Sequence, residues 1–223
     1  MDGQKPKVAA IVPAYNEEKT IGPIIKILKT SPLIDEVIVI SDGSNDDTIR
    51  ICNEIGPEIC HQLPIRSGKG KAMQHGVAHT DAPIIVFFDA DLYGLNEKHI
   101  EKIVEPVLKG EKVMNVALRD RGPFLMKLSA HLPLIGGERA MNRHIFEDVP
   151  EEYKQGFMVE QALNYYCRSR GYKYGSVPCP GLTIRRKMQK VGFAKGLLQY
   201  IKMFYQVFKA MVIVRWAKLI GKF

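Results

Sequence analysis

The sequence lacks the features that mark several common classes of protein. Its four cysteines form no CxxC pair, and this favours reduced, structural thiols over a disulfide framework or a zinc site. Low-complexity segments and internal repeats are absent. Zinc-finger, ribonucleoprotein and basic-zipper patterns are also missing, so we expect no nucleic-acid partner despite a net charge of +8. The polar start of the chain, residues 1–5, does not resemble a secretory leader, which predicts a cytoplasmic location.

Acidic residues are missing from the last part of the chain. Of the 32 basic and 24 acidic residues, ten basic and no acidic residues lie from Arg185 onward. The uncharged stretches there are far shorter than the ~20 residues of a membrane-spanning helix. We therefore predict a domain over 1–184 and a basic amphipathic helical tail over 185–223, suited to the inner surface of an anionic membrane. A helix pair that covers the sheet or forms a homodimer is the alternative.

The first 90 residues alternate apolar, β-branched runs with segments of helical periodicity. The runs predict buried strands at Lys7–Pro13, Glu36–Ser41, Ile59–Leu63 and Ile84–Phe88. Helices are expected around Ile21–Leu28, Asp47–Ile55 and Gly70–His79, and a fifth strand near Lys112–Leu118. This order predicts an α/β fold with a mostly parallel sheet, whose ligands bind at the carboxyl ends of the strands.

Polar residues follow three of the predicted strands at those ends. Asp89 and Asp91 flank a small residue directly after the strand Ile84–Phe88. Mg²⁺ and Mn²⁺ bind proteins through one or two carboxylates together with substrate phosphate oxygens. A DxD tripeptide is common by chance, and its alternative is a turn. Its position after a buried strand favours a site for a divalent metal and a diphosphate.

Two further loops carry groups suited to a nucleotide. Asp42 opens a glycine turn whose later residues cap a helix, so its carboxylate is available for a base or a ribose. The basic loop 66–71 opens another helix, where backbone amides and the helix dipole favour phosphate. We expect Lys69 to contact the diphosphate, with a solvated loop as the alternative.

The ordered motifs VPAYNEE, SDGSNDDT, GKGKAMQHG and FFDADL resemble those of the family 2 glycosyltransferases, which have the GT-A fold, over residues 7 to about 180. The resemblance implies a Rossmann-like sheet flanked by helices, a UDP- or GDP-linked sugar donor, and a Mg²⁺ or Mn²⁺ cofactor. It also implies that Asp42 meets the base and that Asp89 and Asp91 hold the metal diphosphate. The residues that it places around the nucleoside are Pro13, Tyr15 and Glu17.

The second half of the chain resembles two kinds of family 2 enzyme, the polyprenyl- or dolichyl-phosphate sugar synthases and the glucosyl-3-phosphoglycerate synthases. The resemblance implies an acceptor loop formed by Gly136, Gly137, Glu138 and Arg139. Glu160, at the start of a helix, takes the place of an acceptor-side carboxylate. Such a group could deprotonate a hydroxyl acceptor or orient a phosphate, and a charge that only stabilises the helix start is the alternative.

Two arginines, Arg119 and Arg121, follow the fifth predicted strand. Guanidinium groups match phosphate oxygens, so these residues suit an anionic acceptor or the donor diphosphate, and a surface ion pair is the alternative. In relatives a histidine after the last strand can complete the metal site, but Thr183–Arg186 contains none. The expected metal ligands from the protein are therefore Asp89 and Asp91 alone.

The sequence thus predicts an enzyme that moves a sugar from a nucleoside-diphosphate sugar to a phosphate-bearing acceptor. The basic tail favours polyprenyl or dolichyl phosphate at a membrane surface. A soluble glucosyl-3-phosphoglycerate-synthase-like transferase, acting on a small phosphorylated acceptor, is the second hypothesis. A scaffold protein that keeps the fold without catalysis is the third, although it predicts loss of the carboxylates that are present here.

Overall fold

The computed structural model describes residues 5–120, 136–156 and 158–184, together with Val212 and Trp216. Arg121 and the amphipathic helix predicted within 185–223 therefore lie outside the described residues, except for those two positions. In the described part of the chain no helix is long and apolar enough to cross a membrane.

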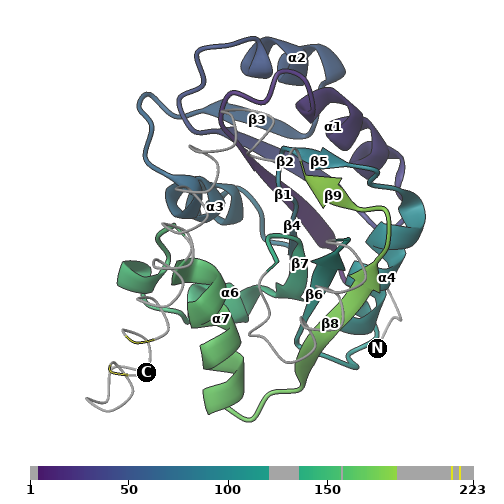
Figure 1. The fold of residues 1–223 in the computed structure, drawn as a ribbon, viewed down its shortest axis with the longest axis vertical. Helices are drawn as coiled ribbons and strands as arrows, with labels where there is room; N and C mark the ends of the chain where they lie inside the picture. The colour runs from purple at the N-terminus through teal and green to yellow at the C-terminus, as the bar shows by residue number, and fades with distance from the viewer. Residues whose placement is uncertain (1–4, 121–135, 157, 185–211, 213–215, 217–223) are drawn as a thin grey trace.

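A seven-stranded sheet in the order β3-β2-β1-β4-β7-β6-β8 forms the centre of the molecule (Figure 1). Its strands are β1 (Val8–Ala14), β2 (Glu36–Ser41), β3 (Ile59–Gln62), β4 (Ile84–Phe87), β6 (Met114–Arg119), β7 (Arg139–Asn142) and β8 (Tyr174–Cys179). Four strand pairs are parallel, and β7 pairs antiparallel with both β4 and β6. The predicted α/β fold with a mostly parallel sheet is confirmed.

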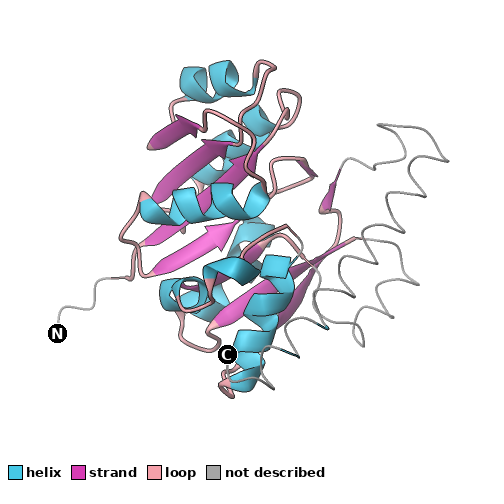
Figure 2. Cartoon of the chain, turned by 90° about the vertical axis from the view of Figure 1, so that its left-hand side faces the viewer, coloured by secondary structure: helices cyan, strands magenta, loops and turns pink. Residues whose placement is uncertain are grey.

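Helices cover both faces of the sheet (Figures 1 and 2). They are α1 (Ile21–Thr30), α2 (Thr48–Ile55), α3 (Lys69–Ala78), α4 (Glu97–Leu108), α6 (Arg143–Glu147) and α7 (Met158–Ser169), with a 3-10 turn η1 at Glu151–Tyr153. Residues of α1, α2 and α4 pack in one apolar cluster, and those of α3, α6 and α7 pack in another. Along β1, Ile11 joins the α3 side and Val12 joins the α1 side. Because helices cover both faces of the sheet, the sequence of β1 is a continuous apolar run.

The predicted elements of the first half agree with the structure to within about two residues, whereas those of the second half are incomplete. The expected strand Lys112–Leu118 is β6, but neither β7 nor β8 stands out as an apolar run in the sequence. A small antiparallel sheet of β5 (Leu92–Tyr93) and β9 (Thr183–Ile184) was also not predicted. Strands of only two residues are too short to show a recognisable periodicity in the sequence.

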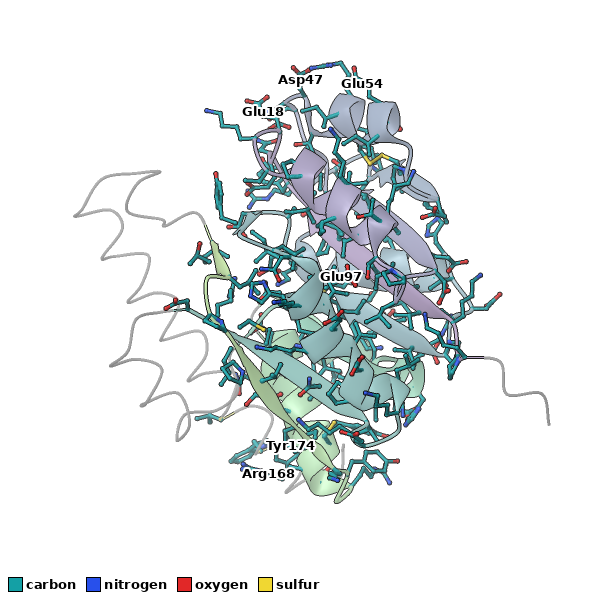
Figure 3. All side chains as sticks on the ribbon, turned by 90° about the vertical axis from the view of Figure 1, so that its right-hand side faces the viewer. Glu18, Asp47, Glu54, Glu97, Arg168 and Tyr174 are labelled. Carbon is teal, nitrogen blue, oxygen red and sulfur yellow. A yellow bond between two sulfur atoms is a disulfide. The ribbon has the colours of Figure 1, made fainter. Side chains whose placement is uncertain are left out.

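The cysteines correct one expectation. Cys52 of α2 and Cys60 of β3 form a disulfide, which Figure 3 shows as a yellow bond, while Cys167 and Cys179 are free and buried. The sequence favoured reduced thiols at all four positions. Their spacing gives no sign of the pair, because the packing of α2 beside β3 brings the two sulfurs together.

Candidate active site

The loops that follow β1 and β2 are joined by hydrogen bonds. The amide of Asn16 donates to Oγ of Ser44 (3.1 Å), and the amide of Asn45 donates to Oδ1 of Asn16 (3.0 Å). Asn16 has a φ of 54°, a left-handed conformation that asparagine adopts more readily than most residues. The two loops therefore form one layer at the carboxyl ends of β1 and β2, where the resemblance predicts the nucleoside.

Asp42, directly after β2, is buried and organises the basic loop. Its Oδ1 accepts a hydrogen bond from the amide of Ser67 (2.6 Å), and its Oδ2 accepts one from the amide of Gly68 (2.8 Å). Gly43 has a φ of 69°, and a Cβ there would lie 2.8 Å from the backbone nitrogen of Arg66. A side chain at position 43 would thus push the basic loop away from Asp42.

The other residues predicted for the donor gather at the same edge. The guanidinium of Arg66 lies 4.1 Å from the centre of the Tyr15 ring, within the range of a cation–π contact. Pro13 is buried in β1, and the amide of Glu17 donates to Oγ1 of Thr48 (2.9 Å). Sequence reasoning did not anticipate the Arg66–Tyr15 pair, because 51 residues of chain separate the two.

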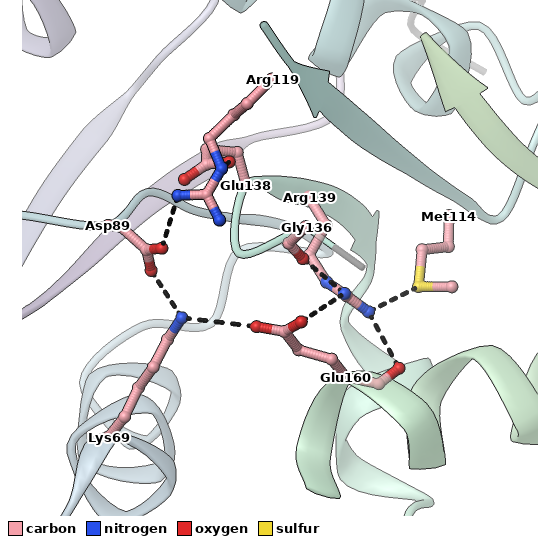
Figure 4. Close-up of polar contacts among 8 residues, drawn as sticks. All are labelled: Lys69, Asp89, Met114, Arg119, Gly136, Glu138, Arg139 and Glu160. Atoms are coloured by element: carbon pink, nitrogen blue, oxygen red, sulfur yellow. Dashed lines mark hydrogen bonds and ion pairs between the residues drawn. The ribbon is translucent and has the colours of Figure 1, made fainter. Parts of the chain in front are cut away.

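Asp89 is the centre of a group of ion pairs (Figure 4). Its Oδ1 lies 2.5 Å from Nζ of Lys69, the first residue of α3, and its Oδ2 lies 3.4 Å from a terminal nitrogen of Arg119, at the end of β6. Burial alone would raise the pKa of Asp89, but the two cations hold it at about 2. The carboxylate is therefore ionised at neutral pH and able to accept a cation.

Asp91 follows Asp89 by two residues, and its charge helps to raise the pKa of Arg119. Next to it, Leu92 pairs with Ile184 of β9, so the strand that lacks the expected histidine lies beside the DxD segment. Among the described residues no group of three or more His, Cys, Asp or Glu side chains could hold a metal ion. The two aspartates offer only hard oxygen ligands, a donor set that fits Mg²⁺ or Mn²⁺ completed by substrate or water oxygens.

The segment before β7 lies directly against this group. A Cβ on Gly137 would lie 2.3 Å from Oδ2 of Asp89, and one on Gly136 would lie 2.6 Å from the carbonyl oxygen of Ala117. Because both residues lack a Cβ, the backbone can approach these protein groups closely. It could approach a bound ligand in the same way. This tight fit fixes the loop beside Asp89.

Glu138 is fully buried next to the same arginine. Its Oε2 lies 3.3 Å from Nε of Arg119. Burial raises the pKa of Glu138 to about 7, against the opposing effect of Arg119. Arg119 thus lies between two carboxylates, those of Asp89 and Glu138.

Glu160, in the first turn of α7, lies between two cations. One carboxylate oxygen is 3.7 Å from Nζ of Lys69, and the other is 3.9 Å from a terminal nitrogen of Arg139. Lys69 therefore lies between Asp89 on the donor side and Glu160 on the predicted acceptor side. The fold brings together three cations and three carboxylates from α3, the end of β4, β6, β7 and α7 (Figure 4).

The chain also matches known proteins. Residues 9–166 match the sequence profile of the family described as Glycosyl transferase family 2. The chain belongs to glycosyl transferase family 2. The match covers the layer around Asp42, the Asp89 group and the start of α7, so the family assignment includes every element that forms the site. It agrees with the resemblance drawn from the four ordered motifs.

Within family 2, the chain is similar to glucosyl-3-phosphoglycerate synthases. It is 33% identical over 125 residues to the enzyme of Mycobacterium tuberculosis (strain CDC 1551 / Oshkosh), covering 52% of this chain and 39% of that protein. It is 30% identical over 193 residues to the enzyme of Mycolicibacterium paratuberculosis (strain ATCC BAA-968 / K-10), covering 70% and 58%. The chain thus spans about two to three fifths of the length of these relatives.

Crystal structures of the Mycobacterium tuberculosis glucosyl-3-phosphoglycerate synthase share the fold. The complex with phosphoglyceric acid has a TM-score of 0.76 at 26% identity, covering 94% of this chain and 80% of that one. The complex with Mn²⁺, UDP and glucosyl-3-phosphoglycerate has a TM-score of 0.74 at 27% identity, with the same coverage. The GT-A fold expected from the motifs is confirmed.

Proposed function

We propose that this protein transfers a sugar from UDP-sugar to a small phosphorylated acceptor of the phosphoglycerate type. One observation carries the proposal, namely the ionised Asp89 at a strand end, held between Lys69 and Arg119. A metal carboxylate beside two cations suits a reaction in which a diphosphate leaves and an anionic acceptor enters. The choice of UDP and of a small acceptor rests on relatives whose structures contain UDP and phosphoglyceric acid.

The donor is proposed to bind across the layer formed by the loops after β1 and β2. Tyr15 and Arg66 offer a flat surface to the nucleoside, and Asp42 meets the base or holds the loop that does. Pro13 and Glu17 complete the layer from the β1 side. Lys69 and the amide groups at the start of α3 face the diphosphate, because a helix start attracts negative charge.

Asp89 and Asp91 would hold the divalent metal. When bound, Mg²⁺ or Mn²⁺ neutralises charge that develops on the leaving diphosphate. Lys69 adds a second positive charge beside the proposed diphosphate site, and its ion pair with Asp89 holds it at that site. Arg119 lies on the other side of Asp89, where it can bind the phosphate of the acceptor.

The acceptor is proposed to lie over the Gly136–Gly137 segment, near Glu160. The Glu160 carboxylate can take the proton of an attacking hydroxyl, as a small phosphorylated acceptor with a free hydroxyl requires. If the acceptor is an ionised phosphate, no base is needed and Glu160 orients the substrate. Arg121 is proposed to assist the acceptor phosphate, although it lies outside the described residues.

A lipid-phosphate acceptor at a membrane surface is the second candidate. The basic residues from Arg185 onward favour it, as does the amphipathic spacing of that segment. The similarity to glucosyl-3-phosphoglycerate synthases favours the small acceptor, and we give that acceptor precedence.

A donor and acceptor screen tests both candidates. The full-length protein is incubated with Mn²⁺ and either UDP-glucose or GDP-mannose, and with 3-phosphoglycerate, glycerol 3-phosphate or polyprenyl phosphate in detergent. We expect UDP release that depends on both Mn²⁺ and 3-phosphoglycerate. Transfer to polyprenyl phosphate alone would establish the second candidate. If no acceptor stimulates release above the level of the Asp91→Asn variant, transferase activity toward these substrates is excluded.

A further inference from the structure

The side chain of Arg139 is one of the largest fully buried groups in the molecule, with a relative exposure of 1%. It comes from the first residue of β7, the antiparallel strand between β4 and β6. Burying a guanidinium is unfavourable unless acceptors surround it, so a sequence keeps such a group when its contacts are needed. A side chain in this position has almost no exposed surface with which to contact a ligand.

The guanidinium holds three segments of the chain together. One terminal nitrogen donates to the carbonyl oxygen of Gly136 (2.5 Å) and lies 3.9 Å from the carboxylate of Glu160. The other terminal nitrogen donates to the backbone carbonyl of Glu160 (3.3 Å) and contacts the sulfur of Met114 (4.0 Å). Arg139 therefore contacts both the backbone and the side chain of Glu160.

The contacts of Arg139 link the Glu160 carboxylate to the segment beside Asp89. The carboxylate of Glu160 lies between Arg139 and Lys69, with one oxygen toward each cation. The carbonyl of Gly136 belongs to the segment whose next residue, Gly137, lies against Asp89. Arg139 thus fixes the glycine segment and the acceptor-side carboxylate in one arrangement relative to Asp89 (Figure 4).

We infer that Arg139 is a positioning residue, which orients the Glu160 carboxylate toward the acceptor and couples it to the glycine segment beside Asp89. The inference builds on the proposed function, and it replaces for this residue the direct acceptor contact that the resemblance implied. A displacement of about 1 Å in a catalytic group can lower the rate about 100-fold, so orientation is a sufficient reason to bury a charge.

Kinetics of four proteins test the inference: wild type, Arg139→Met, Glu160→Gln and the double variant. Methionine keeps the length and apolar volume of the side chain and removes the charge. We expect Arg139→Met to lower kcat about 100-fold while the affinity for UDP with Mn²⁺, measured by calorimetry, stays within about twofold. The double variant should be no more than about twofold slower than Glu160→Gln, because the two groups act as one unit. Independent, multiplying effects would overturn the inference.

Two further variants separate positioning from a general loss of stability. Arg139→Lys retains the charge with fewer donors, and we expect it to recover part of kcat. Arg143→Met is the matched control, since Arg143 also belongs to the β7–α6 segment and pairs with Glu147 (2.6 Å). We expect the control to lower the unfolding midpoint and leave kcat unchanged. An equal loss of kcat in the control would show that any disturbance of this segment slows the reaction.

Failure of the proposed function would leave the inference testable. If the wild type transfers no sugar to any acceptor, the same four proteins are compared by urea unfolding and by hydrogen exchange of the amides at 158–164. We expect the effects of Arg139→Met and Glu160→Gln on the unfolding midpoint to be less than additive, with faster exchange in Arg139→Met. Additive midpoints and unchanged exchange would show that Arg139 does not position Glu160.

Discussion

The two sides of the site, which we propose to bind the sugar donor and the acceptor, are built differently. On the donor side, backbone amides of the loops donate to single side-chain oxygens, as those of Ser67 and Gly68 donate to Asp42. On the acceptor side, side-chain charges hold the structure, with Glu138, Arg139 and Glu160 all buried. Removing one such acceptor affects only the amides that it binds, whereas a buried ion network needs every member, because removing one leaves a charged partner unpaired. Substitutions should therefore act locally on the donor side and spread on the acceptor side.

The largest effect is expected where the two sides meet, at the carboxylates proposed to hold the metal. Asp91→Asn removes one of the two proposed negative ligands and should lower the rate of sugar transfer by about 1,000-fold, a loss of about 4 kcal/mol of transition-state stabilisation. The rate of metal-dependent UDP release measures it, and the unfolding temperature should stay near that of the wild type. Unchanged turnover would contradict the assignment of Asp91 to the metal.

A smaller effect is expected when a methyl group enters the acceptor side. Gly137→Ala places a Cβ 2.3 Å from the Asp89 carboxylate, so the loop or Asp89 must move, and we expect kcat to fall about 30-fold with a loss of about 1–3 kcal/mol in stability. Steady-state kinetics and urea unfolding measure the two losses.

Gly22→Ala is the matched control on the donor half. Gly22 lies inside α1, and a Cβ there would meet side-chain carbons at 3.4 and 3.5 Å, an ordinary contact distance. Alanine is preferred to glycine within a helix by up to about 1 kcal/mol, so the control should be neutral or stabilising and fully active. If both variants lose activity equally, the proposed contrast between the two sides is wrong.

A moderate effect is expected at the centre of the donor side. Asp42→Asn keeps the shape of the side chain but replaces one acceptor oxygen with a donor that faces a backbone amide. Loss of a charged hydrogen bond of about 1.5 kcal/mol should raise the KM for the donor about tenfold, with kcat changed less than threefold. Calorimetry with UDP and Mn²⁺ should give the same change in affinity. A fall in kcat at constant KM would place Asp42 in the chemical step.

The smallest effect is expected far from the site, at the first residue of β2. Burial would raise the pKa of Glu36, but hydrogen bonds from Lys7 and Thr80 lower it below its usual value. A carboxyl whose folded pKa is depressed stabilises the protein above its unfolded pKa of about 4.3, and this contribution is lost as pH falls through the folded pKa.

Glu36→Gln should therefore reduce the free energy of unfolding at pH 7 by less than about 1 kcal/mol, with activity unchanged. Urea unfolding across pH 7 to 3 measures the difference from wild type, which should shrink toward the acid end. A difference that grows as pH falls would contradict the assigned direction of the pKa shift.

The sequence alone determined most of the donor side. The runs Glu36–Ser41 and Ile84–Phe88 identified strands, and the polar residues after them identified the edge of the sheet where we propose that ligands bind. This succeeded because parallel strands buried on both faces leave an unmistakable apolar run, and because parallel strands end at a common edge. Asp42, Lys69 and Asp89 could be named as candidates for the same reason.

Only the tertiary structure decided the acceptor side. The short antiparallel strand β7 lies between β4 and β6. This placement buries Glu138 beside Arg119 and Arg139 beside Glu160. The resemblance placed both residues in an acceptor loop but gave no sign of their burial or of their partners, which lie about 20 residues away along the chain. Local patterns specify the strands and turns of a chain, but the pairing of buried charges depends on which elements become neighbours, and that is settled when the whole sheet assembles.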